Sequence, residues 1–308
     1  MAPAITVYEV GPRDGLQNEA VAVPTEGKLA LVRALAEAGL RRIEATSFVS
    51  PRWIPQLGDA DALVPALPRV PGVTYLVLVP NARGLERLSE ALRSADDGAP
   101  EVAAAVFMSA SESHNRKNLN RTVEESLREL GEVVPAALAR GLRVRGYVST
   151  VFGCPYEGAV DPERAAGVAE ALVALGCEQI SLGDTIGVAT PALTRRVVTR
   201  MLRTIPAPKL ALHMHDTRGT ALANVLAGLD LGIATFDASI GGLGGCPYAP
   251  GASGNLATED LVYMLEGMGY DTGVDFEKLI AAGALAQRLV GRRLPGKTLQ
   301  AELARTEA

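Results

Sequence analysis

Residues 210–240 read LALHMHDTRGTALANVLAGLDLGIATFDASI. A short apolar run, 210–214, is separated from a second, 236–240, by a segment with helical periodicity. The apolar residues of that segment follow the i, i+3, i+4, i+7 spacing of one buried helix face: Leu222, Val225, Leu226 and Leu229. The stretch therefore predicts a strand–helix–strand unit.

The same alternation runs through the whole chain. Strand-like segments occur at 5–10, 42–45, 73–79, 102–108, 142–148, 179–182, 210–214 and 236–240. Each is followed by a helix-like segment, and no linker interrupts the series. Eight such units predict an α/β fold, a closed parallel (β/α)8 barrel of the TIM type, with an open doubly wound sheet as the alternative. We expect one catalytic domain over 1–308, with the barrel at about 5–270 and extra C-terminal helices at about 271–308.

Composition narrows the class of protein. The net charge is −5, whereas a nucleic-acid-binding protein normally shows a basic stripe. No apolar run reaches the roughly 20 residues that a transmembrane helix requires, and the N-terminus does not resemble a signal or transit peptide. The three cysteines are far apart in sequence, which is typical of free thiols in a reducing compartment. We therefore expect a cytoplasmic protein without a nucleic-acid or membrane partner.

In a (β/α)8 barrel, the chemistry takes place at the C-terminal ends of the strands. His213 and His215 stand at the end of the seventh strand, two residues apart, so both side chains should face the barrel mouth while Met214 faces the outer layer. Two adjacent imidazoles can clamp a metal ion. The alternative is a pair of packed polar side chains.

A second polar cluster, Gly11-Pro12-Arg13-Asp14-Gly15, ends the first strand. Asp14 could supply an oxygen ligand to the same metal. Arg13 could bind a substrate carbonyl oxygen and stabilise negative charge that develops on it. The alternative is a surface Arg–Asp pair in a turn.

Two acidic residues, Glu44 and Asp184, end the second and sixth strands. A carboxylate after an apolar strand is costly unless it has a partner or a catalytic task. Direct proton transfer and a supporting ion pair to Arg13 or a histidine are both open interpretations.

A glycine-rich loop follows the eighth strand, with four glycines in the five residues 241–245. The spacing matches neither a P-loop nor a dinucleotide-binding motif, so a mobile lid carrying Cys246 is favoured over a phosphate cradle. The Cys246 thiol could move a proton, and the amide oxygen of Asn255 could be a further metal ligand. Cys154 is the competing thiol, and Cys177 lies at the wrong end of its strand.

Two further residue types bear on the mechanism. His114 follows the fourth strand in a polar stretch, and we expect it to be a solvent-facing loop residue. A Schiff-base mechanism needs a lysine at the C-terminal end of a strand, and only Lys117 is in a suitable place. A metal mechanism is therefore favoured over a covalent one.

Together these segments resemble the hydroxymethylglutaryl-CoA lyase family over almost the whole chain. The matching stretches are VGPRDGLQNE (10–19), TSFVSP (46–51), RGYVS (145–149), GCPYEG (153–158), SLGDTIG (181–187), HMHDT (213–217), GLGGCPY (242–248) and GNLATED (254–260). The loop ending in Gly-Cys-Pro-Tyr is the most specific of them. His114, Arg218 and Thr220 depart from the family pattern near the mouth.

The resemblance implies cleavage of 3-hydroxy-3-methylglutaryl-CoA to acetyl-CoA and acetoacetate by a homodimer. Carried over residue by residue, it gives Mg²⁺ or Mn²⁺ ligands at Asp14, His213, His215 and Asn255. It also implies enolate stabilisation by Arg13, a proton-transferring thiol at Cys246, and active-site acids at Glu44 and Asp184.

The chemistry of the residues agrees with this expectation. A metal that binds the substrate hydroxyl eases its deprotonation, and Arg13 stabilises the enolate left by bond cleavage. Cys246 or a metal-held histidine such as His213 could then protonate the enolate. Three alternatives remain: a lyase for a longer branched acyl-CoA, a Claisen-type synthase on the same barrel, and a barrel that binds metal or CoA esters without catalysis.

Overall fold

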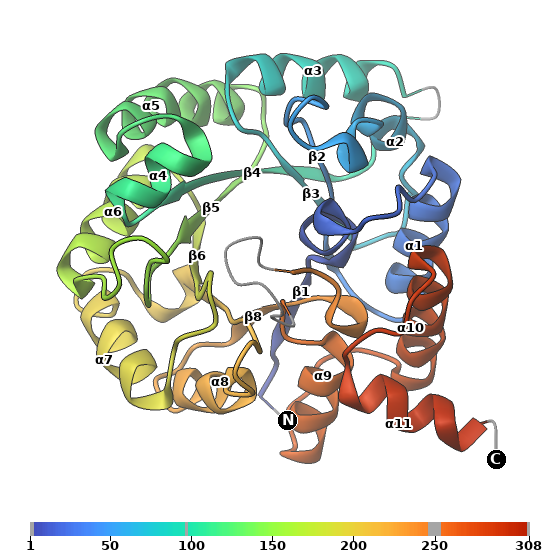
Figure 1. Ribbon diagram of the computed structural model, residues 1–308. Helices are drawn as coiled ribbons and strands as arrows, with labels where there is room; N and C mark the ends of the chain where they lie inside the picture. The colour runs from blue at the N-terminus through green and yellow to red at the C-terminus, as the bar shows by residue number, and fades with distance from the viewer. Residues whose placement is uncertain (1–2, 96–97, 246–253, 307–308) are drawn as a thin grey trace.

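The computed structural model describes residues 3–95, 98–245 and 254–306. Each strand pairs in parallel with the next along the chain, and β8 pairs back with β1, so the sheet closes into a barrel (Figure 1). The strands are β1 Thr6–Glu9, β2 Arg42–Ser47, β3 Thr74–Leu78, β4 Val102–Ser109, β5 Val144–Ser149, β6 Gln179–Gly183, β7 Leu210–His213 and β8 Thr235–Ala238. The predicted (β/α)8 barrel is confirmed, and the open doubly wound sheet is wrong.

Helices surround the barrel as an outer ring (Figure 1). They are α1 Thr25–Glu37, α2 Ala60–Ala66, α3 Ala82–Arg93, α4 Glu112–Leu119, α5 Val123–Ala139, α6 Pro162–Leu175, α7 Pro191–Met201, α8 Ala221–Leu229 and α9 Thr258–Gly267. Two more, α10 Phe276–Val290 and α11 Lys297–Thr306, follow the last unit, and α10 lies beside α1. None of the helices in the described ranges combines the length and the apolar character needed to cross a membrane.

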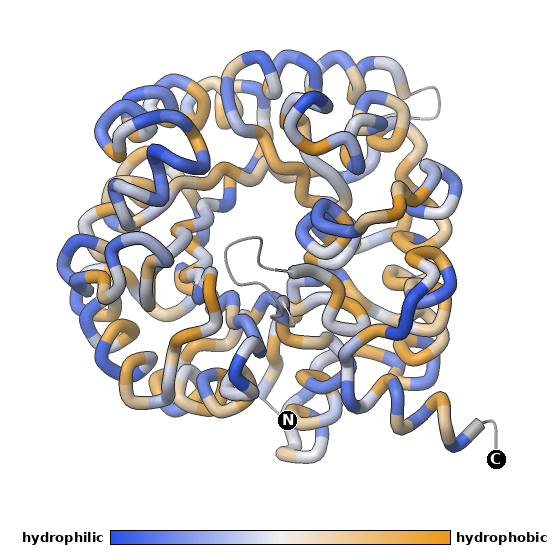
Figure 2. Tube along the Cα trace, viewed as in Figure 1, coloured by the Kyte–Doolittle hydropathy of each residue, from blue (hydrophilic) through white to orange (hydrophobic). Residues whose placement is uncertain are grey.

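Two apolar layers hold the barrel together. The larger layer lies between the strands and the helices, and Figure 2 shows hydrophobic colour along β4 and on the strand-facing sides of several helices. A smaller cluster fills the interior: Tyr8, Leu76, Leu78, Ala103, Ala105 and Tyr147. Strand geometry explains the division, because Val144 and Val148 of β5 belong to the outer layer while Tyr147 belongs to the inner one.

Candidate metal centre

The turn after β1 brings Arg13 and Asp14 to the barrel mouth. Residues Gly11–Gly15 form a short helical turn in which the amide of Asp14 donates to the carbonyl oxygen of Val10 at 2.7 Å. Gly11 is required for this packing, since a Cβ there would lie 2.7 Å from Glu9 Oε1 and 2.8 Å from Ile240 Cγ2. The turn is therefore set directly against the end of β8.

The end of β7 supplies the two histidines. His213 is the last residue of the strand, and His215 forms an isolated bridge with Asn255, which enters from the segment before α9. Met214 between them is buried in the outer apolar layer, as expected. The strand period thus aims both imidazoles at the mouth.

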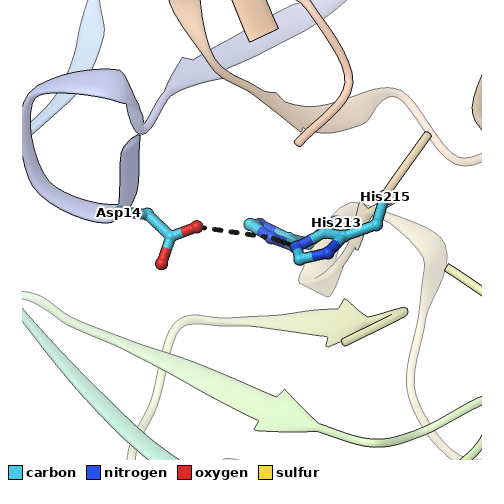
Figure 3. A group of neighbouring side chains, drawn as sticks. All are labelled: Asp14, His213 and His215. Atoms are coloured by element: carbon cyan, nitrogen blue, oxygen red, sulfur yellow. Dashed lines mark hydrogen bonds and ion pairs between the residues drawn. The ribbon is translucent and has the colours of Figure 1, made fainter. Parts of the chain in front are cut away.

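Asp14, His213 and His215 converge on one point, although Asp14 is about 200 residues away from the histidines along the chain. One ligand atom from each lies within 4.8 Å of the others, and Figure 3 shows the Asp14 carboxylate pointing at the two rings. Asn255 joins them, because its Nδ2 donates to Asp14 Oδ2 at 2.9 Å. The four residues predicted as metal ligands are therefore neighbours.

The donor set of this cluster fits a divalent cation. Asp237 Oδ2 lies 3.2 Å from His213 Nδ1, which leaves Nε2 of that ring facing Nε2 of His215 at 3.2 Å. Two imidazole lone pairs at that separation repel each other unless a cation or a proton lies between them. The Oδ1 of Asn255 is buried and has no hydrogen-bond partner among the described residues. Imidazole nitrogens together with carboxylate and amide oxygens form a donor set for a divalent metal ion.

The surroundings shift the pKa values of the two histidines in opposite directions. Burial lowers the pKa of His213, but the hydrogen bond and the charge of Asp237 outweigh burial, and the net shift is upward. Burial and the neighbouring His213 lower the pKa of His215 to about 4. For Asp14, burial raises the pKa, yet Arg13 and the histidines reverse this and lower it, so the carboxylate is ionised.

Asp237 is itself held by a buried ion pair inside the barrel. Arg145 contacts both carboxylate oxygens, at 2.6 and 3.1 Å, and Ser181 Oγ donates to Oδ2 at 2.7 Å. The Arg145 guanidinium stacks on the Tyr8 ring, 3.9 Å from its centroid. This interior network fixes the orientation of the His213 ring from below.

Arg13 is clamped between two carboxylates. Its Nη2 lies 2.6 Å from Glu44 Oε2, and its Nη1 lies 2.7 Å from Asp14 Oδ1. Burial opposes the charge on Arg13, but the two carboxylates outweigh it and raise the pKa, so the guanidinium stays charged. Glu44 is fully buried and is not among the described residues that line the cavity, which favours the ion-pair interpretation over direct proton transfer.

Asp184 organises the loop after β6. Its two carboxylate oxygens accept from the amides of Val188 at 2.9 Å and Ala189 at 3.1 Å. Burial raises its pKa to about 6, in spite of those hydrogen bonds. It is also absent from the described cavity wall, so its contacts support a structural part in the site.

A cavity of about 450 Å³ opens above the cluster. Its polar floor includes Arg13, Asp14, Tyr147, His213 and His215. Its wall is largely apolar, with Val49, Trp53, Ile54, Leu78, Pro80, Phe107 and Leu119. A hollow with a charged floor and an apolar wall suits an organic substrate with a polar reacting end.

The three cysteines differ in placement. Cys246 lies outside the described residues, although Gly245, directly before it, lines the cavity. Cys154 is buried, and its Sγ lies 2.9 Å from Ser111 Oγ. Cys177 is buried in the outer core, as predicted for packing.

The expectation for His114 was wrong. The residue lies in α4, is only 1% exposed and lines the cavity. Its Nδ1 lies 2.6 Å from Ser109 Oγ, and burial lowers its pKa to about 4, so the ring is neutral. The polar sequence around it was misleading, because Ser111 and Asn115 are buried hydrogen-bonding residues and not surface residues.

The other two departures near the mouth do not reach the described cavity wall. Arg218 donates to the carbonyl oxygens of Ile186 and Gly187, and Thr220 donates to that of Ala189. Both therefore brace the loop after β6.

Comparison with known proteins identifies the family. The family model described as HMGL-like matches residues 4–286. The chain belongs to the HMGL-like family. The chain is also 52% identical over 296 residues to the hydroxymethylglutaryl-CoA lyase of Bacillus subtilis, covering 96% of both chains. It is 50% identical to the mitochondrial hydroxymethylglutaryl-CoA lyase of Bos taurus, covering 96% of this chain and 89% of that one.

Solved structures of HMGL-like proteins share the whole fold. The Bacillus subtilis HMG-CoA lyase superposes with a TM-score of 0.93 at 50% identity, covering 98% of this chain and 99% of that one. An HMG-CoA lyase from Acinetobacter baumannii, solved with coenzyme A and 3-methylmalate, gives a TM-score of 0.89 at 40% identity, covering 97% and 95%.

Sequence reasoning missed part of the site. Asp237 and Arg145 lie within β8 and β5, and Tyr147 lies on the cavity floor. Glu44 was predicted because it is a carboxylate in an apolar strand, and Asp237 has the same feature. What the sequence could not supply is the pairing of Asp237 with Arg145, 92 residues away.

Proposed function

We propose that this protein is a divalent-metal-dependent lyase that cleaves 3-hydroxy-3-methylglutaryl-CoA to acetyl-CoA and acetoacetate. The observation that carries the proposal is the convergence of Asp14, His213 and His215 beside the clamped Arg13, on the floor of a 450 Å³ cavity. The identity of about 50% to hydroxymethylglutaryl-CoA lyases over 96% of the chain supports it.

Four residues are proposed to hold the metal, Mg²⁺ or Mn²⁺: Asp14, His213, His215 and Asn255. When bound there, the ion makes the substrate hydroxyl more acidic and neutralises carboxylate charge. Asp237 holds the His213 ring in one orientation, and the Oδ1 of Asn255, which has no hydrogen-bond partner among the described residues, would be available as an oxygen ligand.

The reaction requires a balanced movement of electrons. The 3-hydroxyl gives its proton to a basic side chain at the mouth, which balances the proton that the enolate later takes up. C3 becomes the ketone of acetoacetate, and the C2–C3 bond breaks. Its electron pair passes to C2 and the thioester oxygen as an enolate, which is then protonated to give acetyl-CoA. We assign Arg13 to bind the thioester oxygen, because Glu44 and Asp14 hold its guanidinium in place before the charge develops.

Proton transfer is assigned to side chains at the mouth. We propose Cys246, on the loop that begins at the cavity edge, as the thiol that protonates the enolate, with His213 as the competing group. Glu44 and Asp184 are the two acidic residues proposed to belong to the active site. Their buried contacts support positioning roles, toward Arg13 for Glu44 and toward the loop after β6 for Asp184.

The oligomeric state, the compartment and the pathway are proposed from the resemblance to the family and from the composition. We propose that the protein acts as a homodimer in the cytoplasm, with an acyl-CoA as its partner molecule. The product acetoacetate would place it in ketone body formation or leucine catabolism.

The deciding experiment measures acetoacetate release from 3-hydroxy-3-methylglutaryl-CoA with Mg²⁺, and again after chelation. Release that stops on chelation and returns with Mg²⁺ or Mn²⁺ is the expected result. No release by folded, metal-loaded protein would overturn the assignment. The assay would then be repeated with longer branched 3-hydroxyacyl-CoA esters and in the synthase direction.

Cys246→Ala should reduce turnover by about 10²- to 10⁴-fold, the usual contribution of a positioned proton donor. Metal affinity, measured by calorimetry, should not change, because the thiol is not a proposed ligand. Cys177→Ala is the matched control, since that thiol is packed in the outer core. An unchanged rate in Cys246→Ala would remove the thiol from the mechanism.

A further inference from the structure

Thr150 has a backbone conformation that residues with a side chain seldom adopt. It follows β5 directly, is fully buried and has a φ of 58°. Among the described residues, Asn120 is the only other non-glycine residue with positive φ. Asn120 ends α4, where asparagine is common in this conformation, whereas a β-branched threonine is strained in it. Such strain persists only where the surroundings impose it, and it is concentrated at functional sites.

The left-handed turn directs two consecutive amides at the loop after β6. The amide of Thr150 donates to Thr185 Oγ1 at 2.7 Å, and the amide of Val151 donates to the carbonyl oxygen of Gly183 at 3.1 Å. Along an extended strand, the backbone groups of successive residues face opposite neighbours. In a turn with a left-handed residue, successive N–H groups can face the same side. The conformation of Thr150 therefore allows the end of β5 to hold the next loop at two points.

The side chain of Thr150 supports this conformation. Its Oγ1 donates to the carbonyl oxygen of Ser149 at 2.7 Å and accepts from the amide of Ser111, at the start of α4, at 3.2 Å. Thr150 thus joins the segments that follow β4, β5 and β6. Ser149, Gly183 and Thr185 line the cavity, whereas Thr150 is not among the described lining residues. Any effect of Thr150 on a ligand would therefore pass through these neighbours.

We propose that Thr150 is a positioning residue whose left-handed backbone fixes Gly183 and Thr185 in the wall of the substrate cavity. The inference rests on the proposed function. A continued strand would direct only one of the two amides at the loop after β6, so the wall would lose one of its two attachments. The two hydrogen bonds of the Thr150 hydroxyl hold the strained residue in place. The wall therefore has its shape before a substrate arrives.

Thr150→Ala and Thr150→Gly test the conformation as a matched pair. Both variants lack the hydroxyl, and they differ only in the Cβ that makes positive φ unfavourable. At most positions alanine stabilises a protein more than glycine, but here Thr150→Gly should have the higher melting temperature. Asn120→Ala and Asn120→Gly are the control pair and should show the same order, because φ there is 54°. A higher melting temperature for Thr150→Ala would refute the inference.

Activity separates positioning from strain alone. With 3-hydroxy-3-methylglutaryl-CoA, Thr150→Ala should lower kcat/KM by about 10- to 100-fold, the effect of a small misplacement of the groups around a substrate. Thr150→Gly should stay within about threefold of the wild type, because glycine adopts positive φ without strain. Both Asn120 variants should match the wild type, since Asn120 is not among the described residues that line the cavity. A wild-type rate in Thr150→Ala, or an equal loss in Thr150→Ala and Thr150→Gly, would contradict the inference.

Thr185→Val tests the route of the effect. This variant removes the acceptor of the Thr150 amide and keeps the size of the side chain. If Thr150 acts through that hydrogen bond, the double variant with Thr150→Ala should have about the kcat/KM of the less active single variant. Losses that multiply would show that Thr150 acts by another route, and the inference would be wrong.

A binding measurement separates this inference from the proposed function. Calorimetry with the same ester after chelation needs no turnover, and the Kd values of the variants should follow the same order as the losses in kcat/KM. A wild type that binds the ester but does not cleave it with Mg²⁺ would overturn the lyase assignment. The order of the Kd values would then decide the inference, and equal values in Thr150→Ala and wild type would overturn it.

Discussion

His213 shows how single residues set the chemistry of the site. One edge of its ring meets the Asp237 carboxylate, and the other faces His215 and Asp14. The carboxylate in turn is paired with Arg145, both residues being almost wholly buried. Each contact restricts the next, so the imidazole ring is held in one orientation.

His213→Ala should weaken Mg²⁺ or Mn²⁺ binding by about 100-fold, since it removes a ligand from a small donor set. Isothermal titration calorimetry on protein freed of metal checks the affinity. His114→Ala is the matched control, because this second cavity histidine is outside the proposed ligand cluster and should leave the affinity unchanged. Equal affinities in wild type and His213→Ala would contradict the proposed ligand set.

Among the elements, the C-terminal helices brace the end of the barrel that carries the site. Asp260 of α9 accepts from the first two amides of α11, those of Lys297 at 3.2 Å and Thr298 at 2.6 Å. The Lys297 ammonium reaches Asp216 at 2.9 Å, and the amide of Gly296 donates to the carbonyl oxygen of Gly241 at 2.9 Å. The start of α11 is thereby joined to the segments that follow His215 and β8.

Asp260→Ala should lower the free energy of unfolding by about 1–2 kcal/mol, because two helix-terminal amides lose their acceptor. Lys297→Ala should cost less than about 1 kcal/mol, since the Lys297 side chain is 74% exposed and solvent screens its charge. Urea denaturation of both variants and the wild type measures the difference. An equal loss of stability in the two variants would show that the two hydrogen bonds accepted by Asp260 stabilise the protein no more than the ion pair between Lys297 and Asp216 does.

Across the whole molecule, closure of the barrel buries two carboxyl groups between β1, β8 and α9. Glu9 accepts hydrogen bonds from Gly11, Ile240 and Thr258. Glu259 accepts one from Gly241. Burial raises their pKa values, to about 7 for Glu9 and about 8 for Glu259, in spite of these bonds. Closing the barrel therefore makes stability depend on pH.

Glu259→Gln should flatten the decline of stability between about pH 5 and pH 8. In the folded protein, the Glu259 carboxyl keeps its proton up to about pH 8. In the unfolded chain, the same carboxyl loses its proton near pH 4.5. The folded state thus binds more protons across this window, and rising pH destabilises it. The wild type should lose about 2–4 kcal/mol more than the variant over that range. Urea unfolding at several pH values measures this.

Glu26→Gln, on the exposed side of α1, is the control and should follow the wild-type curve. Parallel curves for wild type and Glu259→Gln would mean that the buried carboxyl does not titrate in this window.

Local patterns in the sequence determined the barrel, because strand and helix periodicities and the β–α alternation are properties of short segments. The same locality placed His213 and His215 on one face, and it put Arg13 and Asp14 at a strand end. These interpretations depended on residues within one or two turns of each other, where chain geometry alone sets the direction of side chains.

Only the tertiary structure decided which of these groups meet. Asp14 meets Asn255, 241 residues away, because the barrel closes β1 against β8. Arg145 finds Asp237 across the interior, and His114, in a stretch of polar sequence, turns inward to line the cavity. Such contacts depend on packing between distant segments, and neither propensity nor spacing along the chain carries that information.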